Sequence, residues 1–286
     1  MLQSMPPTVA AVNVPSSARL ETRGQSPENW IEIRNLSKTF KTRNGTTKAL
    51  TAVNLDIRKG EFVSVIGPSG CGKSTLMMLL AGLDKASGGT IQVGDKFIKG
   101  PNSDIGVVFQ QDVLLEWRNT LANVMLQAEI RKLDIPSHKA RAEELLKMVG
   151  LERFHGAFPH ELSGGMRQRV SICRGLLHNP PLLVMDEPFG ALDALTREQL
   201  QIDLLKLWWK MNMTVVFITH SISEAVFMSD RIVVMSPRPG RIEKIIDVDL
   251  PRPRRLKARE TPEFAHYVQE VQDIFKTLGV LNEEEE

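Results

Sequence analysis

Gly67-Pro68-Ser69-Gly70-Cys71-Gly72-Lys73-Ser74-Thr75 is the part of this 286-residue chain that most constrains its architecture. It follows an apolar run, Glu61 to Ile66, and opens a helical pattern from Lys73 to Ala81, which is the context of a P-loop. Glycines let successive backbone N–H groups turn towards phosphate oxygens, while the lysine reaches the β- and γ-phosphates and Ser74 binds Mg²⁺. We therefore predict that residues 67–75 bind the phosphates of a nucleotide. A glycine-rich turn with a surface lysine is the structural alternative.

The chain on either side of this loop alternates short apolar runs with helical patterns. Such runs indicate a largely parallel sheet that is covered on both faces. Besides residues 61–66, they are Ile105–Phe109, Leu182–Met185, Thr214–Ile218 and Arg231–Met235.

Two regions depart from this pattern. Strand-like alternation begins at Trp30, Asn44-Gly45 is a hairpin turn signal, and Ala49–Ile57 suits a half-buried strand. Between Leu121 and Leu177 the apolar residues recur at helical spacing. We expect an α/β fold: a P-loop NTPase core with a mixed sheet, an N-terminal antiparallel β subdomain and an inserted α-helical subdomain.

Composition narrows the class of protein. The formal net charge of +2 gives no electrostatic footprint for nucleic acid. Two cysteines, Cys71 and Cys173, fit a reducing cytosol rather than a disulfide framework. The sequence carries neither a signal-peptide pattern nor an apolar run long enough for a membrane span. We expect a cytosolic protein that reaches a membrane only through partners.

Acidic residues end one of the predicted strands. Leu182-Leu183-Val184-Met185 leads into Asp186 and Glu187. Beside a P-loop, Asp186 is placed to hold the water shell of a metal ion, and Glu187 to polarise a water that attacks the γ-phosphate. The structural alternative is a strand that simply ends in acidic loop residues.

Two further polar side chains lie at predicted strand ends. His220 follows Val215–Thr219, and Gln110 follows Ile105–Phe109. An imidazole there would face the γ-phosphate, and a neutral amide can bind Mg²⁺ or orient water. A histidine at a strand end is, in general, more often structural than catalytic.

A second anion-binding pattern occurs at Leu162-Ser163-Gly164-Gly165-Met166-Arg167-Gln168-Arg169. It joins a capping serine and two glycines to the start of an amphipathic helix, whose N-terminal N–H groups and dipole attract anions. The chain thus has two elements suited to phosphate but only one nucleotide-binding loop. The residues alone do not say whether both elements face the same phosphate.

Taken together, these motifs resemble the nucleotide-binding subunits of ABC transporters from about Ile31 to Asp247. Residues 67–75 are similar to the Walker A loop, Gln110 to the Q-loop and Leu162–Met166 to the signature motif. Leu182–Glu187 resembles the Walker B strand, Ala191-Leu192-Asp193 the D-loop and His220 the switch histidine.

The resemblance implies roles for these residues. The cofactors are ATP and Mg²⁺, Glu187 is the general base, and His220 contacts the γ-phosphate. Two subunits face each other head to tail, so that Ser163, Gly164 and Gly165 cap the nucleotide bound by the partner. Phe40 matches the position that stacks on adenine, although it also suits the core of a strand.

A finer likeness extends from Val108 to Arg118 and from Leu250 to Arg254. These segments resemble the ATPases of nitrate, sulfonate, taurine and bicarbonate importers. The resemblance implies a multi-spanning permease that contacts Leu114, Leu115 and Trp117, an extracytoplasmic solute-binding protein, and a place at the cytoplasmic face of the membrane. Ordinary core packing is the alternative for each of these three side chains.

The implied organisation has three parts. Residues 1–28 form a disordered leader, residues 29–250 an ABC ATPase domain with its helical subdomain at about 111–178, and residues 251–286 a helical extension with an acidic tail. Thr261-Pro262 predicts the start of a helix that runs towards Leu278, and Ser221-x-x-Glu224 has the spacing of a capping box.

The leading hypothesis is thus an ATP-hydrolysing importer subunit, and the alternative is a soluble ABC-type ATPase that acts on ribosomes or DNA. One P-loop and no heptad insert favour the importer. We also expect Cys71 to be part of the backbone turn of the loop rather than a nucleophile, with an exposure beside Lys73 that would permit alkylation. The arginines from Arg252 to Arg259 are expected to form a solvated face or to contact membrane-subunit loops or lipid headgroups.

Overall fold

The computed structural model describes residues 29–42, 45–190 and 192–281. The predicted leader (1–28), the turn residue Asn44, Ala191 of the predicted D-loop and the acidic tail Glu283–Glu286 lie outside these residues.

A six-stranded mixed sheet forms the centre of the molecule, in the order β10-β9-β3-β8-β7-β6. Its strands are β3 (Phe62–Ile66), β6 (Ile105–Val108), β7 (Leu182–Asp186), β8 (Thr214–Ile218), β9 (Arg231–Met235) and β10 (Ile242–Asp247). All neighbours are parallel except β10, which pairs antiparallel with β9. The five predicted apolar runs are therefore the five parallel strands, and β10 is an edge strand that the sequence pattern did not predict.

A second, antiparallel sheet has the order β2-β1-β4-β5. It contains β1 (Asn29–Thr42), β2 (Gly45–Arg58), β4 (Gly88–Val93) and β5 (Lys96–Phe97). β1 and β2 pair from Asn29–Arg58 to Thr42–Gly45, so the predicted hairpin is confirmed on both sides of its turn.

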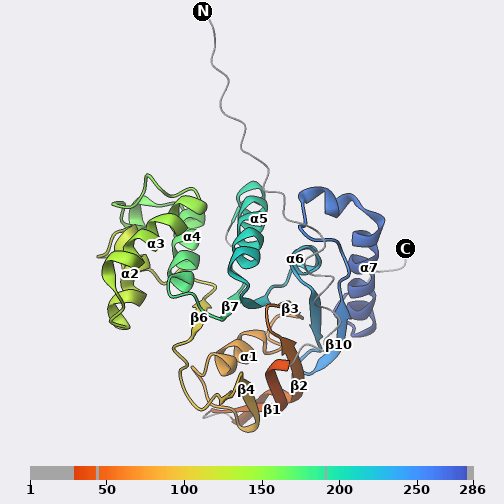
Figure 1. Ribbon diagram of the computed structural model, residues 1–286. Coiled ribbons are helices and arrows are strands. Elements are labelled where there is room, and N and C mark those ends of the chain that lie inside the picture. Colours follow the sequence, from red (N-terminus) through yellow and green to blue (C-terminus); the bar gives the residue numbers. More distant parts are fainter. Residues whose placement is uncertain (1–28, 43–44, 191, 282–286) are drawn as a thin grey trace, which may run out of the picture.

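Helix α1 (Lys73–Leu80) lies between the two sheets (Figure 1). Its Leu76 and Leu80 pack in one apolar cluster with Ile31 and Leu55 of the antiparallel sheet and with Val63 of β3. A second cluster covers the other face of the central sheet and contains Phe62 and Ile66 of β3. The alternating side chains of β3 thus belong to different cores, which explains why its whole sequence is apolar.

Helices gather in one part of the molecule away from α1 (Figure 1). They are α2 (Thr120–Ile130), α3 (Ile135–Met148) and α4 (Gly164–Leu176), with a short 3₁₀ turn at Pro159–Glu161 between α3 and α4. Gly150 adopts φ +74° directly after α3, as expected for a glycine that ends a helix. With the mixed sheet and the antiparallel sheet, these helices confirm the predicted fold class.

The remaining helices are α5 (Ala194–Met211), α6 (Ile222–Met228) and α7 (Pro262–Thr277), with a 3₁₀ turn at Leu256–Glu260. Thr261 caps α7, and its hydroxyl accepts a hydrogen bond from the Phe264 N–H at 3.3 Å. No helix in the described ranges combines the length and the apolar character that a membrane span requires.

The predicted capping box at the start of α6 is only half formed. The Ser221 hydroxyl accepts a hydrogen bond from the Glu224 N–H at 3.3 Å. The Ser221 N–H, however, donates to the hydroxyl of Thr219 at 3.0 Å, and the Glu224 carboxylate accepts the hydrogen bond of that same hydroxyl at 2.6 Å. Glu224 therefore binds Thr219, the residue that follows β8, instead of capping its own helix.

Of the arginines that follow β10, only Arg255 is exposed, so the prediction of a solvated face was wrong for Arg252, Arg254 and Arg259. Arg254 is only 5% exposed and donates hydrogen bonds to four backbone carbonyls, at 2.5 to 3.1 Å. The acceptors belong to Val226, Phe227, Ser229 and Val248. Burial lowers the pKa of Arg254 to about 9. Its guanidinium fixes the start of the C-terminal region to the last turn of α6, where carbonyls lack helical partners.

Candidate active site

The P-loop connects β3 to α1 and is held by its own lysine and by the antiparallel sheet. Lys73 is 6% exposed, and its Nζ donates to the carbonyls of Gly67 at 2.8 Å and Pro68 at 3.1 Å. Gly72 caps α1 with φ +108°, and a Cβ at this position would lie 2.7 Å from Leu50 Cδ2. The loop therefore requires glycine here for its backbone conformation and for the close approach of β2.

Cys71 lies inside this loop, and the expectation that it is exposed was wrong. The residue is 1% exposed, and burial raises the pKa of its thiol. The thiol is therefore a poor nucleophile, because a thiolate is the reactive form.

The parallel strands bring the predicted polar side chains together at the carboxyl ends of the strands of the central sheet. Gln110 follows β6, Glu187 follows β7 and His220 follows β8. One oxygen of Glu187, Oε2, lies 3.2 Å from Gln110 Nε2 and 3.2 Å from His220 Nδ1. Three residues that are far apart in the sequence thus meet at a single carboxylate.

Glu187 has a backbone conformation that the sequence did not predict. Its φ is +44°, in the left-handed region that non-glycine residues adopt rarely, and its N–H donates to the Ile218 carbonyl at 2.9 Å. Such a conformation persists only where surrounding structure fixes it, and it is frequent at active sites. The hydrogen bond to Ile218, the last residue of β8, fixes Glu187 at the carboxyl ends of the strands, beside His220.

Asp186 precedes this turn and is 7% exposed. Burial raises the pKa of its carboxyl group, and a hydrogen bond with Ser74 opposes that rise. Ser74, Asp186 and the amide of Gln110 together offer oxygen donors of the kind that Mg²⁺ prefers. Within the described residues, no three His, Cys, Asp or Glu side chains gather as a self-sufficient metal site. A magnesium ion here would therefore need oxygens from phosphate and water as well.

The second glycine-containing loop lies at the start of α4. Ser163 is the N-cap, as predicted, and its hydroxyl accepts a hydrogen bond from the Met166 N–H at 3.3 Å. Within the described part of the chain, no hydrogen bond or ion pair joins Ser163–Gly165 to residues 67–75. Helices α1 and α4 are also well separated in the molecule (Figure 1).

The segment after Gln110 is held by α4 and α2. Arg174 donates to the carbonyls of Asp112 at 2.7 Å and Val113 at 2.8 Å, and Asn123, which is fully buried, accepts the N–H of Leu115 at 2.8 Å. These anchors present Trp117, which is 75% exposed. Sequence reasoning missed Arg174 and Asn123, because each acts on backbone atoms of a loop that is distant in sequence.

The three predicted docking residues differ in exposure. Leu115 is half-buried and Trp117 is exposed, whereas Leu114 is 8% exposed and packs in the core cluster. The prediction that Leu114 lines a docking groove is therefore corrected: this side chain stabilises the core.

Phe40 lies apart from these strand ends, in the β1–β2 hairpin opposite Thr47. Its ring is 39% exposed, and Lys38 Nζ lies 4.8 Å from the ring centroid. The ring is thus accessible for stacking, although no described contact joins it to residues 67–75.

The chain is similar in sequence to known ATP-binding proteins. Residues 50–190 match the family described as "ABC transporter". An uncharacterized ABC transporter ATP-binding protein of Methanocaldococcus jannaschii is 47% identical over 246 residues, which cover 86% of this chain and 91% of the relative. The chain belongs to the ATP-binding subunits of ABC transporters. As a member of that family it is an ATP hydrolase.

Other relatives of this ABC ATPase have more specific names. A taurine import ATP-binding protein of Rhizobium johnstonii is 46% identical, over 85% of this chain and 95% of the relative. An aliphatic sulfonates import ATP-binding protein of Bacillus cereus is 43% identical, over 78% of this chain and 88% of the relative.

A solved structure supports the same assignment. The dimeric post-hydrolysis state of an ATP-binding cassette bound to ADP and Pi superposes with a TM-score of 0.70 and 36% sequence identity. The match covers 77% of the ABC ATPase and 99% of that chain. The fold of this subunit is therefore that of a cassette that has been observed as a dimer with nucleotide.

Proposed function

We propose that this subunit hydrolyses ATP at sites shared between two copies and so drives a membrane importer of a small anion. The observation that carries the proposal is the position of Glu187, whose Oε2 is within 3.2 Å of both Gln110 and His220. A carboxylate at the carboxyl end of a strand beside a P-loop can accept the proton of a water molecule that attacks the γ-phosphate.

The phosphates would be bound by residues 67–75. The backbone N–H groups of Gly67, Ser69, Gly70, Cys71 and Gly72 would surround them. Lys73 would neutralise the β- and γ-phosphates, and Thr75 would support the first turn of α1. Proline lacks an N–H, so Pro68 contributes shape and its carbonyl, which already accepts from Lys73 at 3.1 Å. Phe40 would stack on adenine with its exposed face.

The residues fit a magnesium ion. Ser74 and Asp186 would hold it with the amide oxygen of Gln110, and the bound ion would supply positive charge that offsets charge on the phosphates. Because Gln110 Nε2 faces Glu187, its amide oxygen remains the atom available to the metal side of the site.

The proposal requires a second copy of the chain. Ser163, Gly164 and Gly165 present helix N–H groups of α4, yet they lie apart from the P-loop of the same chain. A head-to-tail dimer would place them over the nucleotide bound by the partner, and the dimeric relative with ADP and Pi supports this arrangement.

The transported solute is inferred from relatives. Their names refer to import of taurine and of aliphatic sulfonates. We propose a solute of this class, a small anion such as a sulfonate, taurine, nitrate or bicarbonate. An extracytoplasmic solute-binding protein would deliver it to a multi-spanning permease. The permease would contact this subunit at Leu115 and Trp117, on the cytoplasmic face of the membrane. These names favour an importer over an ATPase that acts on ribosomes or DNA.

A substitution at the P-loop tests the hydrolytic part. Lys73→Ala should reduce phosphate release from Mg-ATP at least about 100-fold, because a charge that contacts the transferred phosphate is lost. Lys59→Ala, at an exposed lysine, is the matched control and should retain activity. Full hydrolysis by Lys73→Ala would contradict the proposed site.

Co-purification tests the transport part. The tagged wild-type subunit should retain a multi-spanning membrane protein, and Trp117→Ala should lose it. Phe97→Ala replaces another exposed aromatic residue, on the antiparallel sheet, and should retain the membrane protein. Recovery of ribosomes or DNA in place of a membrane protein would support the alternative.

A further inference from the structure

Glu224 is a buried carboxylate that the proposed reaction does not use. It is 7% exposed and lies in the first turn of α6, four residues after His220. Its Oε2 accepts the hydroxyl of Thr219 at 2.6 Å, and Thr219 in turn accepts the Ser221 N–H at 3.0 Å. The backbone on both sides of His220 is thereby held by one hydroxyl and one carboxylate.

Arg197 approaches Glu224 from a different helix. Its Nε lies 3.8 Å from Glu224 Oε1, and its Nη2 donates to the carbonyl of Leu192 at 2.9 Å. Leu192 belongs to the predicted D-loop, between Glu187 and α5. A single guanidinium thus connects this loop with the carboxylate that holds Thr219.

The same loop packs against the predicted signature motif. A Cβ at Gly165 would lie 3.1 Å from Thr196 Cγ2 and 3.3 Å from Leu192 Cδ2. A movement of the first turn of α4 towards α5 would therefore press on Leu192 and Thr196, because close-packed groups transmit displacement.

We propose that Arg197 and Glu224 are positioning residues that couple the two nucleotide sites of the dimer. The inference rests on the proposed function, in which Gly165 faces the partner's nucleotide and His220 faces the nucleotide of its own chain. Contact at Gly165 shifts Leu192, Arg197 carries the shift to Glu224, and Thr219 sets the position of His220 beside Glu187. Nucleotide at one site thereby favours the reactive geometry at the other.

Three substitutions interrupt this connection at different atoms. Arg197→Met removes the guanidinium, Glu224→Gln removes the carboxylate charge while keeping its shape, and Thr219→Val removes the hydroxyl. Each should lower kcat about tenfold and bring the Hill coefficient for ATP from near two towards one, while monomer ATP affinity stays within about twofold. Thr219→Ser keeps the hydroxyl and should restore both kcat and the Hill coefficient.

Glu198→Gln is the matched control on α5. It removes a carboxylate that pairs with Arg259 at 2.8 Å, next in sequence to Arg197 but outside the proposed connection. Its kcat and Hill coefficient should equal those of the wild type. Arg197 is 37% exposed at its side chain, so Arg197→Met should fold even where a buried substitution does not.

Coupling is measured directly by combining Arg197→Met with Thr219→Val. If both act through Glu224, the double variant should lose little more kcat than either single variant. Losses that multiply would overturn the inference. So would wild-type kcat and Hill coefficient in Arg197→Met and Glu224→Gln, equal impairment by Thr219→Ser and Thr219→Val, or the same impairment in Glu198→Gln.

Failure of this inference is distinguishable from failure of the proposed function. If the wild type hydrolyses ATP and Lys73→Ala does not, while Arg197→Met and Glu224→Gln behave as the wild type, only the coupling role is rejected. If the wild type itself does not hydrolyse ATP, both are rejected.

Discussion

Glu187 and His220 follow the neighbouring parallel strands β7 and β8, and their side chains meet with 3.2 Å between Oε2 and Nδ1. The carboxylate is mostly shielded, with 21% of its side chain exposed, whereas the imidazole is 64% exposed. Glu187 is therefore the fixed member of the pair, because its N–H is hydrogen-bonded to Ile218 of β8. His220 is the member that is accessible to a ligand.

Glu187→Gln should abolish turnover without preventing ATP binding. Loss of a positioned general base lowers rates by about 10²-fold to 10⁴-fold. Because the amide keeps the shape of the carboxylate, the dimer should form with ATP and persist. Phosphate release and size-exclusion chromatography with ATP measure the two effects. Unaltered hydrolysis would remove Glu187 from the role of base, and Glu243→Gln on β10 provides an exposed control.

Gln110→Ala and His220→Ala should be non-additive. Both side chains contact the same oxygen of Glu187 at 3.2 Å, so each substitution disturbs the same carboxylate. Each should lower kcat at least about tenfold, and the double variant should lose less than the product of the two effects. Fully multiplicative losses in steady-state hydrolysis would mean that the two residues act independently.

Gly164→Asp should separate ATP binding from hydrolysis. A Cβ at Gly164 would meet only Arg167 Nη2, at 3.8 Å, so the helix can accept a side chain there. The added carboxylate would repel the partner's nucleotide. Monomer ATP affinity should stay within about twofold, while hydrolysis falls more than about tenfold.

Gly164 is a cleaner position for this test than its two neighbours. Substitution of Ser163 also removes a helix cap, and a side chain at Gly165 would crowd Leu192 and Thr196. Gly164→Ala is the small, neutral control. If Gly164→Asp lowers monomer ATP affinity and hydrolysis equally, the loop serves the fold rather than a partner's nucleotide.

Arg254→Met should strongly destabilise the protein. It would leave four buried carbonyls without the hydrogen bonds that Arg254 donates, and a buried polar group left unsatisfied costs about 1–3 kcal/mol. Arg255→Met, at the exposed neighbour, is the matched control. Urea denaturation measures the free energy of unfolding. Equal midpoints for the two variants would contradict the role of Arg254.

His178 should make stability depend on pH. Burial first, and then the nearby charge of Arg131, lower its pKa from 6.5 to about 4 in the folded protein. The unfolded chain therefore binds more protons between these values, so the contribution of neutral His178 is complete above about pH 6.5 and is lost as pH falls towards 4.

His178→Gln removes this titrating group. The variant should show a smaller fall in the free energy of unfolding between pH 7 and pH 5 than the wild type, measured in urea. His266→Gln, at an exposed histidine on α7, should retain the wild-type pH dependence. An unchanged pH dependence in His178→Gln would show that other groups cause the loss.

Much of the scaffold was predictable because its signals are local. An apolar run bounded by polar residues specifies a buried strand, and β8 and β9 match the predicted ranges 214–218 and 231–235 without change. The arrangement of Gln110, Glu187 and His220 followed from the geometry of parallel strands, whose carboxyl ends share one edge. The proposed roles of these residues remain predictions.

Other features depend on contacts between distant parts of the chain. The sequence around Arg254 shows a basic cluster, whereas the carbonyls that bury it belong to α6 and to the segment after β10. Likewise, the left-handed backbone of Glu187 depends on a hydrogen bond to Ile218. Strand β10 was missed because its exposed charged residues, Glu243 and Lys244, hide the apolar pattern of an edge strand.

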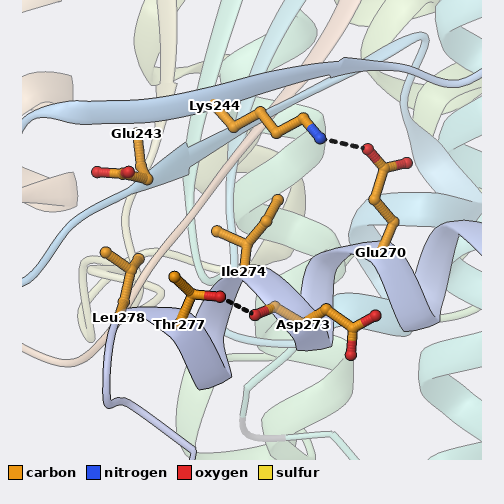
Figure 2. A pocket seen from close by; sticks show the side chains of 7 residues that line it. All are labelled: Glu243, Lys244, Glu270, Asp273, Ile274, Thr277 and Leu278. Atoms are coloured by element: carbon orange, nitrogen blue, oxygen red, sulfur yellow. Dashed lines mark hydrogen bonds and ion pairs between the residues drawn. The ribbon is translucent and has the colours of Figure 1, made fainter.

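Helix α7 lies beside the edge strand β10, and a groove remains between them (Figure 2). It has a volume of about 290 Å³ and lies between β10 and α7, where Lys244 pairs with Glu270 at 2.8 Å. Ile274 and Leu278 of the α7 region line it together with Glu243. Charged groups on an edge strand also discourage pairing with another sheet.

The anchoring of Arg254 has a consequence for the order in which the subunit is made. Ribosomal synthesis delivers the P-loop, Glu187 and His220 before the guanidinium that closes the end of α6. Phe264, Val271 and Phe275, which complete the same apolar core, emerge later still. A nascent chain would thus contain every proposed reacting group before its apolar core is complete. We expect it to acquire a stable nucleotide site only when its final helix has been translated.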